Sequence, residues 1–335
     1  MSTDAAAATP TGPGPLGAPT RSSRETAILT AFYGAIAVFA ALIIFGAVST
    51  HGFLTMTNVR AILSSVAFVG MVAVGTALIM ISGNLFSLAV GSTAAAAAMI
   101  FLALLPHGIV VAFIVPLLMG VVVGAIQGFL VGGIGANTII VTIGAASLIQ
   151  GVALWASKGA TILPPKGDTS FDWLNGHIFT FAVPIYILFG TVVVLDQFLR
   201  RSRFGRELKL VGENIEAARA AGVRTAWVVI GAFCIAGFLF AFAGLELGAF
   251  NESGSLLIEG TQTYDAIAAA VVGGIAITGG RGSVWQALGG AILIAMISDI
   301  LLLRGYSEGI QILVKGVVVF AVVVLARLNR MRAES

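Results

Sequence analysis

The chain has 335 residues, of which 58% are hydrophobic and only 10% are charged, and its mean hydropathy is +1.04. A soluble domain carries about 25% charged residues, so this composition excludes a soluble enzyme, a disordered chain and a nucleic-acid-binding protein. The formal net charge of +3 is too small for a phosphate-binding patch. The hydrophobic runs are apolar along their whole length and lack the alternation of apolar and polar residues that is typical of barrel strands. The composition therefore predicts an all-α, polytopic membrane protein.

Apolar runs of the length that a bilayer requires, about 20 residues each, follow a polar tail along most of the chain. Residues 1–24 are mostly Ala, Thr, Pro and Gly and predict a disordered cytoplasmic tail. We expect eight to ten spans, and most simply ten, within a transmembrane domain at 25–330, followed by a tail at 331–335. The expected spans lie near residues 27–48, 59–81, 85–105, 108–131, 137–156, 178–199, 227–250, 263–279, 284–303 and 310–328.

The distribution of basic residues sets the expected orientation. With ten spans and both termini in the cytoplasm, the Arg and Lys cluster at 200–209 faces the inside, as the positive-inside rule requires. The connection at 157–177 is then the longest outer loop, and it contains Pro164, Pro165 and Trp173. It serves either as a simple tether or as a docking surface for an external partner.

The loop at 200–226 is the only long polar stretch that this orientation places inside. Asn214 is suited to cap a helix N-terminus, and Glu216 adds an acid to the first turn. Ala217 and Ala218 favour helix, and Gly222 stands where a helix would end. The pattern predicts a helix of about two turns, which is marginal alone in water. It either packs on the inner face of its own chain or inserts into a groove on a partner.

Polar residues at membrane depth are candidates for contact with a solute. Asn84 and Ser87 lie beside a break at Gly83, where a broken helix would expose backbone groups to a cavity; the alternative is a capped cytoplasmic turn. Asn137 and Thr142 begin another span, and their alternative role is helix capping and bonding between helices. We regard these four residues as candidates for the substrate path.

Four charged residues also lie within or near the expected spans. Asp299 and Lys315 lie at similar depths on neighbouring antiparallel spans, so we expect them to form a structural ion pair. We expect Glu246 to extend its carboxylate to the outer surface, and Asp265 to open the 263–279 run, where a helix N-terminus favours an acid. The glycine pairs at 273–274 and 279–280 are candidates for a break or hinge.

Catalytic and cofactor motifs are absent from the sequence. There is no G-x-x-x-x-G-K-[ST] phosphate loop, the three histidines have no metal-binding spacing, and no Ser/His/Asp set lies at one depth. We therefore expect no enzyme activity, metal or cofactor in this chain. Energy from ATP would have to come through a partner.

The segment Val211-Gly212-Glu213-Asn214-Ile215-Glu216-Ala217-Ala218-Arg219-Ala220-Ala221-Gly222-Val223 resembles the G-x-N-x-x-A-A-R-x-x-G-I signature of ABC-transporter permeases. It is similar to the ribose/xylose-type sugar permeases, which are related to the branched-chain amino acid permeases. Further matches occur in the same order at 88–92, 140–144, 265–283 and 314–316. The acid of the family's G-G-I-D-L-S-V-G-S segment is missing, because this chain has Gly83-Asn84-Leu85-Phe86-Ser87.

This resemblance implies an importer of a small polar solute, most simply a monosaccharide, in the bacterial cytoplasmic (inner) membrane. It makes 200–226 the coupling loop, whose helix contacts a cytoplasmic ABC ATPase that binds the ATP and Mg. An external or periplasmic solute-binding protein and a second permease copy or paralogue would complete the assembly. The implied coupling-helix residues are Glu213, Asn214, Glu216, Ala217, Ala218, Arg219 and Gly222.

An ion-driven secondary transporter is the alternative function. Such a protein needs an acid or histidine relay at mid-depth, and no acid is clearly placed there. Dependence of uptake on ATP rather than on the proton gradient separates the two.

Overall fold

The computed structural model describes residues 39–167, 170–178, 181–256 and 259–334. The chain forms two units, residues 1–48 and 49–335, and the described part of the first contributes to an apolar helix, Phe39–Ser49. The tail predicted at 1–24 and much of the first predicted span lie outside the described residues. Everything that follows concerns the second unit.

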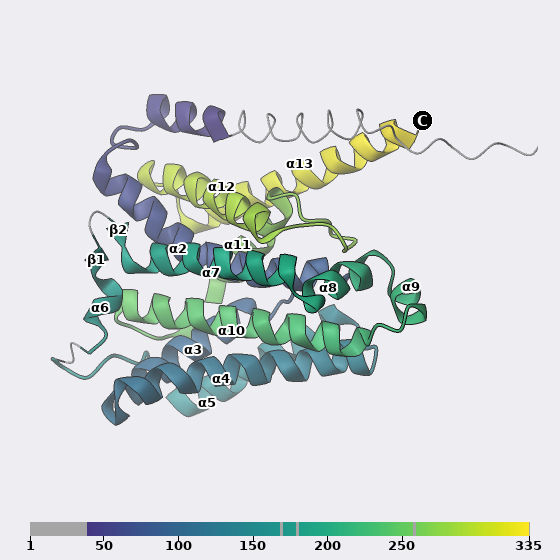
Figure 1. Cartoon of the computed structure of the whole chain (residues 1–335). Helices are drawn as coiled ribbons and strands as arrows, with labels where there is room; N and C mark the ends of the chain where they lie inside the picture. The colour runs from purple at the N-terminus through teal and green to yellow at the C-terminus, as the bar shows by residue number, and fades with distance from the viewer. Residues whose placement is uncertain (1–38, 168–169, 179–180, 257–258, 335) are drawn as a thin grey trace, which may run out of the picture. The chain divides into compact units, whose positions relative to one another are not determined.

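The second unit is a helical bundle, as its composition predicts (Figure 1). Seven of its described helices, counting α3 with η1 and α4 with η2, are long and apolar enough to cross a membrane. The long helices are α2 (Met56–Ile81), α3 (Val90–Leu104), α4 (Ile109–Gly128), α5 (Thr138–Ser157), α7 (Val183–Arg201), α10 (Thr225–Asn251), α11 (Glu259–Val272), α12 (Val284–Leu303) and α13 (Glu308–Glu334). The short elements are η1 (Leu105–His107), the π-helical η2 (Phe129–Gly133), α6 (Asp172–Asn175), α8 (Arg203–Glu213) and α9 (Ile215–Ala220).

One small sheet interrupts the described helices. Strands β1 (His177–Ile178) and β2 (Phe181–Ala182) pair antiparallel just before α7. For this reason α7 begins at Val183 and not near 178, where the sequence predicted it. Similarly, α3 begins at Val90 and not near 85, because residues 84–89 form an irregular connection.

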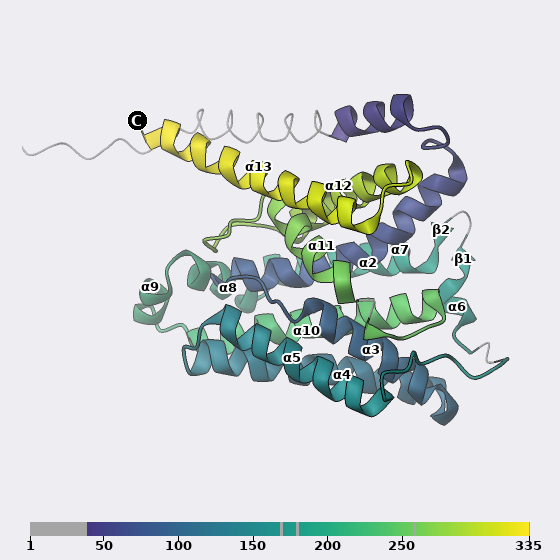
Figure 2. The ribbon, with the colours of Figure 1, turned by 180° about the vertical axis from the view of Figure 1, so that it is seen from behind.

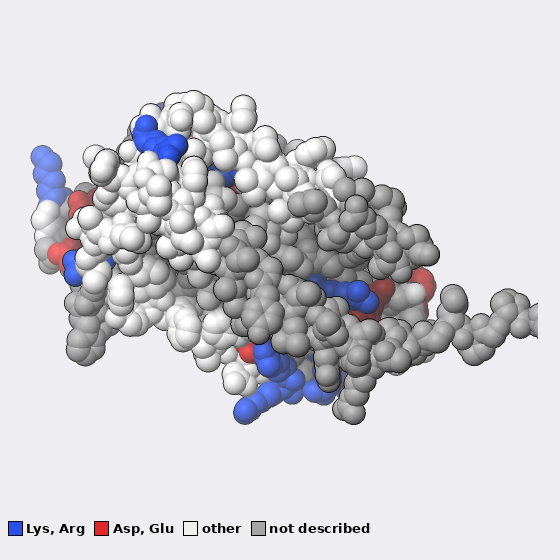
Figure 3. Space-filling view, turned by 90° about the horizontal axis from the view of Figure 1, so that it is seen from above, with Lys and Arg blue, Asp and Glu red and all other residues white. Residues whose placement is uncertain are grey.

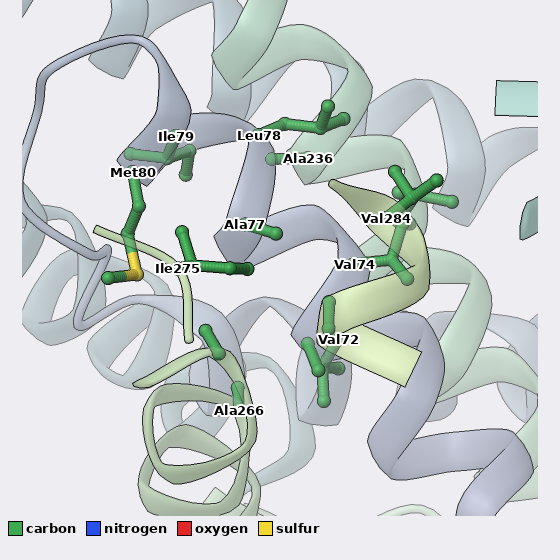
Figure 4. Close-up of a cluster of buried hydrophobic side chains, with 14 of the residues drawn as sticks. Val72, Val74, Ala77, Leu78, Ile79, Met80, Ala236, Ala266, Ile275 and Val284 are labelled. Atoms are coloured by element: carbon green, nitrogen blue, oxygen red, sulfur yellow. The ribbon is translucent and has the colours of Figure 1, made fainter. Parts of the chain in front are cut away.

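Helices α2 and α10 form the centre of the unit. Helix α10 packs against α2, α3 and α4, while α2 also contacts α7, α11 and α12 (Figures 1 and 2). The second half of α2 lies in the largest apolar cluster, which Figure 4 shows around Ala77 and Leu78. Ala236 of α10, Ala266 of α11 and Val284 of α12 complete this cluster. This cluster therefore holds α2 against α10, α11 and α12.

The outer helices expose their apolar side chains. On α5, Ile140, Leu148, Val152 and Trp155 are all more than half exposed. Figure 3 shows a face on which most of the described surface carries neither acid nor base. Exposed apolar side chains such as those of α5 are unfavourable in water and are expected against lipid, where helices satisfy their own backbone groups.

Close contact between α4 and α10 depends on glycine. A Cβ atom on Gly120 would overlap the Gly237 carbonyl group, and one on Gly124 would overlap the Phe233 carbonyl group. A Cβ on Gly128 would lie 2.7 Å from the Cα of Ile230. Glycines at a spacing of four lie on one helix face, and small residues let helices approach closely in lipid.

We therefore expect Gly124→Val to destabilise the protein by at least about 2 kcal/mol, because an overpacked core must separate its helices. Gly144→Val is the matched control on α5, where an added Cβ meets nothing within 4 Å. The check is the free energy of unfolding in detergent micelles. Equal stability of the two variants would contradict the α4–α10 packing.

Candidate functional site

The polar connection after α7 forms two helices, where the sequence predicted one. Helix α8 begins after Ser202, whose side chain accepts a hydrogen bond from the Gly205 N–H at 3.1 Å. Leu208 and Val211 are buried, and Phe204 packs on Gly231 of α10. The apolar spacing of Phe204, Leu208 and Val211 is the helical signal that sequence reasoning missed. Helix α8 is therefore held against the bundle, and it sets the position at which the next helix begins.

Helix α9 is the short helix predicted at 214–222. The Asn214 side chain accepts a hydrogen bond from the Ala217 N–H at 2.9 Å, as an N-cap does. Glu216 in the first turn and Arg219 in the last turn form an ion pair at 3.1 Å. Gly222 follows with φ of +80°, a left-handed conformation that favours glycine just after a helix.

Most of α9 is accessible. Ala218 is the only buried residue of the helix, whereas the Glu216 and Arg219 side chains are 74% and 60% exposed. Glu213, Asn214 and Ala217 are exposed on the same segment. In Figure 1, α9 lies at the end of the bundle opposite to α6, β1 and β2. The segment thus presents an acid, an amide and a cation together on a short, capped helix.

The break before α3 joins the predicted path residues to neighbouring helices. Gly83 turns the chain with φ of +84°, and Asn84 accepts a hydrogen bond from the Thr138 hydroxyl of α5 at 3.3 Å. The buried Ser87 hydroxyl lies 3.4 Å from the side-chain oxygen of Gln127 on α4. The break therefore brings Asn84 to the start of α5 and Ser87 to the end of α4.

The other two path candidates have local partners. The Asn137 side chain accepts a hydrogen bond from the Ile139 N–H at 2.9 Å and caps α5. The buried Thr142 hydroxyl donates to the Ile139 carbonyl of its own helix at 3.3 Å. Asn137 itself is exposed. Thr138 lies beside Asn137 and links this helix start to Asn84.

The ion pair predicted between Asp299 and Lys315 is wrong, because Lys315 pairs with a different acid. Lys315 of α13 pairs with Asp265 of α11 at 2.6 Å, and both side chains are more than 90% buried. Asp299 instead accepts a hydrogen bond from the Asn58 side chain of α2 at 2.7 Å. The prediction failed because depth along a span does not fix how a helix is rotated: Asp265 of α11 faces α13, whereas Asp299 of α12 faces α2.

Glu246 is a second correction. It is 1% exposed, and neither of its carboxylate oxygens has a hydrogen-bond partner among the described residues. The expectation that its carboxylate reaches the outer surface is wrong. Although Glu246 lies only about one turn from the end of its helix, its carboxylate does not reach the surface, because the surrounding helices cover this face of α10.

The connection between α5 and α7 packs on the bundle. Phe171 and Leu174 are buried against Phe101 and Leu245, and Ile162 forms a two-bonded bridge with Gly254. The Trp173 ring stacks on Phe113 with centroids 5.7 Å apart and is half exposed. A free tether would lack these contacts, so the connection is a structured surface.

Comparison with known proteins gives one consistent family. Residues 58–326 match the family described as the permease component of branched-chain amino acid transport systems. The chain is 29% identical over 304 residues to the L-arabinose transport system permease protein AraH of Escherichia coli strain K12, covering 88% of this chain and 90% of that protein. It is 32% identical over 302 residues to the autoinducer 2 import system permease protein LsrC of Photorhabdus luminescens, covering 86% and 88%.

A third relative is the ribose import permease protein RbsC of Haemophilus influenzae, 28% identical over 277 residues, with 81% of this chain and 85% of that protein covered. No solved structure matches the chain at a significant level. The matched region runs from the first turns of α2 into the last helix and contains the polar connection at 200–226 and the break before α3. This chain belongs to the family of ABC-transporter permease components and is a multi-pass protein of the inner membrane.

Proposed function

We propose that the solute of this importer permease is a monosaccharide delivered by an external solute-binding protein. Two relatives that match over more than four fifths of the chain are named for L-arabinose and ribose. The polar groups at the break before α3 suit a neutral solute, since hydroxyl and amide groups outnumber charges there. Asn84 and Ser87 line the path in this proposal, with Asn137 and Thr142 on the adjoining helix.

The observation that carries the ATP-driven function is the exposed, capped helix α9. We propose that a partner ABC ATPase binds it through Glu213, Asn214, Glu216, Ala217, Ala218 and Arg219, with Gly222 ending the helix. Its exposed acid and cation offer a charged surface, and its short length calls for a partner to pack on. ATP and Mg bind to the ATPase, and this chain supplies no catalytic site.

ATP then drives transport by population shift. An ATP-bound partner that binds one conformation of the permease more tightly than the other favours that conformation by the difference in affinity.

A second permease copy or paralogue completes the pathway. On the outer side, we assign the structured loop that carries Trp173 to the solute-binding protein.

The proposed topology has ten spans, with both termini in the cytoplasm. To the seven membrane-length helices it adds α11, α13 and the apolar run that ends at Ser49. This arrangement places α9 inside and α6 outside, in keeping with their positions at opposite ends of the bundle. In this scheme residues 1–24 and 331–335 are tails, and 25–330 is the permease domain with its 200–226 coupling loop.

The test is uptake of labelled pentoses and hexoses in cells that express the complete system. We expect uptake of one monosaccharide to stop when ATP is depleted and to continue when an uncoupler collapses the proton gradient at constant ATP. Uptake that stops with the uncoupler alone would establish the ion-driven alternative and contradict the ATPase assignment.

A further inference from the structure

Three chain segments meet backbone to backbone beside the coupling helix. They are the end of α2 with the break that follows it, the end of α8, and the loop between α11 and α12. Each segment contributes one or two glycines to the contact. We call the four glycines Gly83, Gly212, Gly279 and Gly280 the glycine junction.

The junction leaves no room for a side chain on its inner faces. A Cβ atom on Gly212 would overlap the Ile81 carbonyl oxygen and the Gly280 backbone nitrogen, and one on Gly83 would lie 3.0 Å from the Cα of Gly212. A Cβ on Gly279 would overlap Gly83 and lie 2.8 Å from the Gly212 carbonyl oxygen. The Gly280 N–H donates a hydrogen bond to the Ile81 carbonyl at 3.0 Å.

Backbone conformation also requires glycine at three of these positions. Gly83, Gly279 and Gly280 have φ of +84°, +88° and +73°, values that cost other residues strain. These positions lie between helices, where the chain changes direction. The junction therefore differs from the α4–α10 glycines, which only let two continuous helices approach each other.

Each segment leads directly to an element of the proposed mechanism. Gly212 is followed by Glu213 and Asn214, the start of the ATPase-binding segment. Gly83 precedes Asn84 and the late start of α3, and Gly279 and Gly280 precede α12. A displacement of α9 would therefore reach the break and the α11–α12 loop through the backbone contacts of Gly212 with Gly83 and Gly280, which are too closely packed to absorb the movement.

We propose that the glycine junction transmits the movement of the ATPase-bound coupling helix to the break before α3 and to the loop before α12. Gly83, Gly212, Gly279 and Gly280 are then positioning residues for transport. This inference rests on the proposed ATPase docking. Packed interfaces switch between discrete arrangements. A side chain that prevents the junction from packing should therefore allow ATP hydrolysis to continue with less solute movement.

The experiment uses Gly212→Ala in the complete complex, with partner ATPase and solute-binding protein, reconstituted in lipid vesicles. ATP hydrolysis and labelled monosaccharide uptake are measured together. We expect the ATPase to copurify in the wild-type ratio, because the exposed face of α9 is unchanged, and uptake per ATP hydrolysed to fall at least tenfold. Gly124→Ala is the matched control, a packing glycine whose replacement should lower stability and leave that ratio unchanged.

Gly83→Ala is the second variant: its Cβ would lie 3.0 Å from the Cα of Gly212, so the overlap is smaller than at Gly212, but alanine is strained at a φ of +84°. An unchanged ratio of uptake to hydrolysis in either assembled variant overturns the proposal. Failure of both variants to assemble with the ATPase also overturns it, because the junction would then only support the fold. Failure of the proposed function itself is distinguishable, because the wild-type chain would then show no ATP-driven uptake.

Discussion

Replacing Lys315 by methionine will strongly destabilise the protein, because it leaves Asp265 buried without its cation. The two groups lie 2.6 Å apart and are more than 90% buried. Removing one partner of a buried ion pair costs about 3–5 kcal/mol, whereas replacing both is often close to neutral. We therefore expect the double variant Asp265→Asn/Lys315→Met to recover most of the stability that Lys315→Met loses.

Asp299→Asn is the matched control for this prediction. It keeps an oxygen that can accept the hydrogen bond from Asn58, so we expect a change below about 1 kcal/mol, the usual net value of one hydrogen bond. The measurement is denaturant unfolding in mixed micelles. If Asp299→Asn destabilised the protein as much as Asp265→Asn, or if Lys315→Met were as stable as the wild type, the assignment of the ion pair would be contradicted.

Gly222→Val will abolish uptake while the protein remains in the membrane. Gly222 has φ of +80° and open space around the position of a Cβ atom. Valine there has no steric clash, but it avoids the left-handed conformation, so the end of α9 must change its path. The loss is local to the coupling loop and does not reach the bundle.

Gly305→Val is the matched control for Gly222→Val. Gly305 has φ of +74° and is equally open, but it lies in the link between α12 and α13 at the other end of α12. We expect a similar amount of membrane protein for both variants, measured by quantitative blotting, and near-normal uptake only for Gly305→Val. Normal uptake in Gly222→Val would contradict the coupling role of this loop.

Features that depend on local sequence could be predicted. Asn214 and Gly222 marked the ends of α9, because capping and left-handed turns are properties of a few neighbouring residues. Gly83 marked the end of α2 for the same reason, and the glycine pair at 279–280 marked a break between two helices. Hydropathy found the long apolar helices, because a run of about 20 apolar residues suits a bilayer.

Features that depend on how helices rotate about their axes could not be predicted. Asp265 contacts Lys315 and Asp299 contacts Asn58 because of how α11 and α12 are rotated about their axes, which their sequences do not show. The burial of Glu246 depends on the helices packed over α10. The contact of Gly212 with Gly280 joins segments far apart in sequence, and no local pattern in either segment indicates it.

The most direct test of the central claim is purification of the tagged chain from native membranes in mild detergent, with identification of the copurifying proteins by mass spectrometry. Glu216→Lys is compared with Glu252→Lys, an exposed acid beyond the far end of α10. Reversal at Glu216 opposes the helix dipole by only about 0.3–1 kcal/mol, and it replaces the exposed ion pair with Arg219 by a like-charge pair that costs about 0.2–0.5 kcal/mol, so α9 should survive. We predict that a subunit with an ATP-binding phosphate loop copurifies with wild type and Glu252→Lys and is lost with Glu216→Lys. Retention of that subunit by Glu216→Lys, or its absence from the wild-type preparation, would contradict the account.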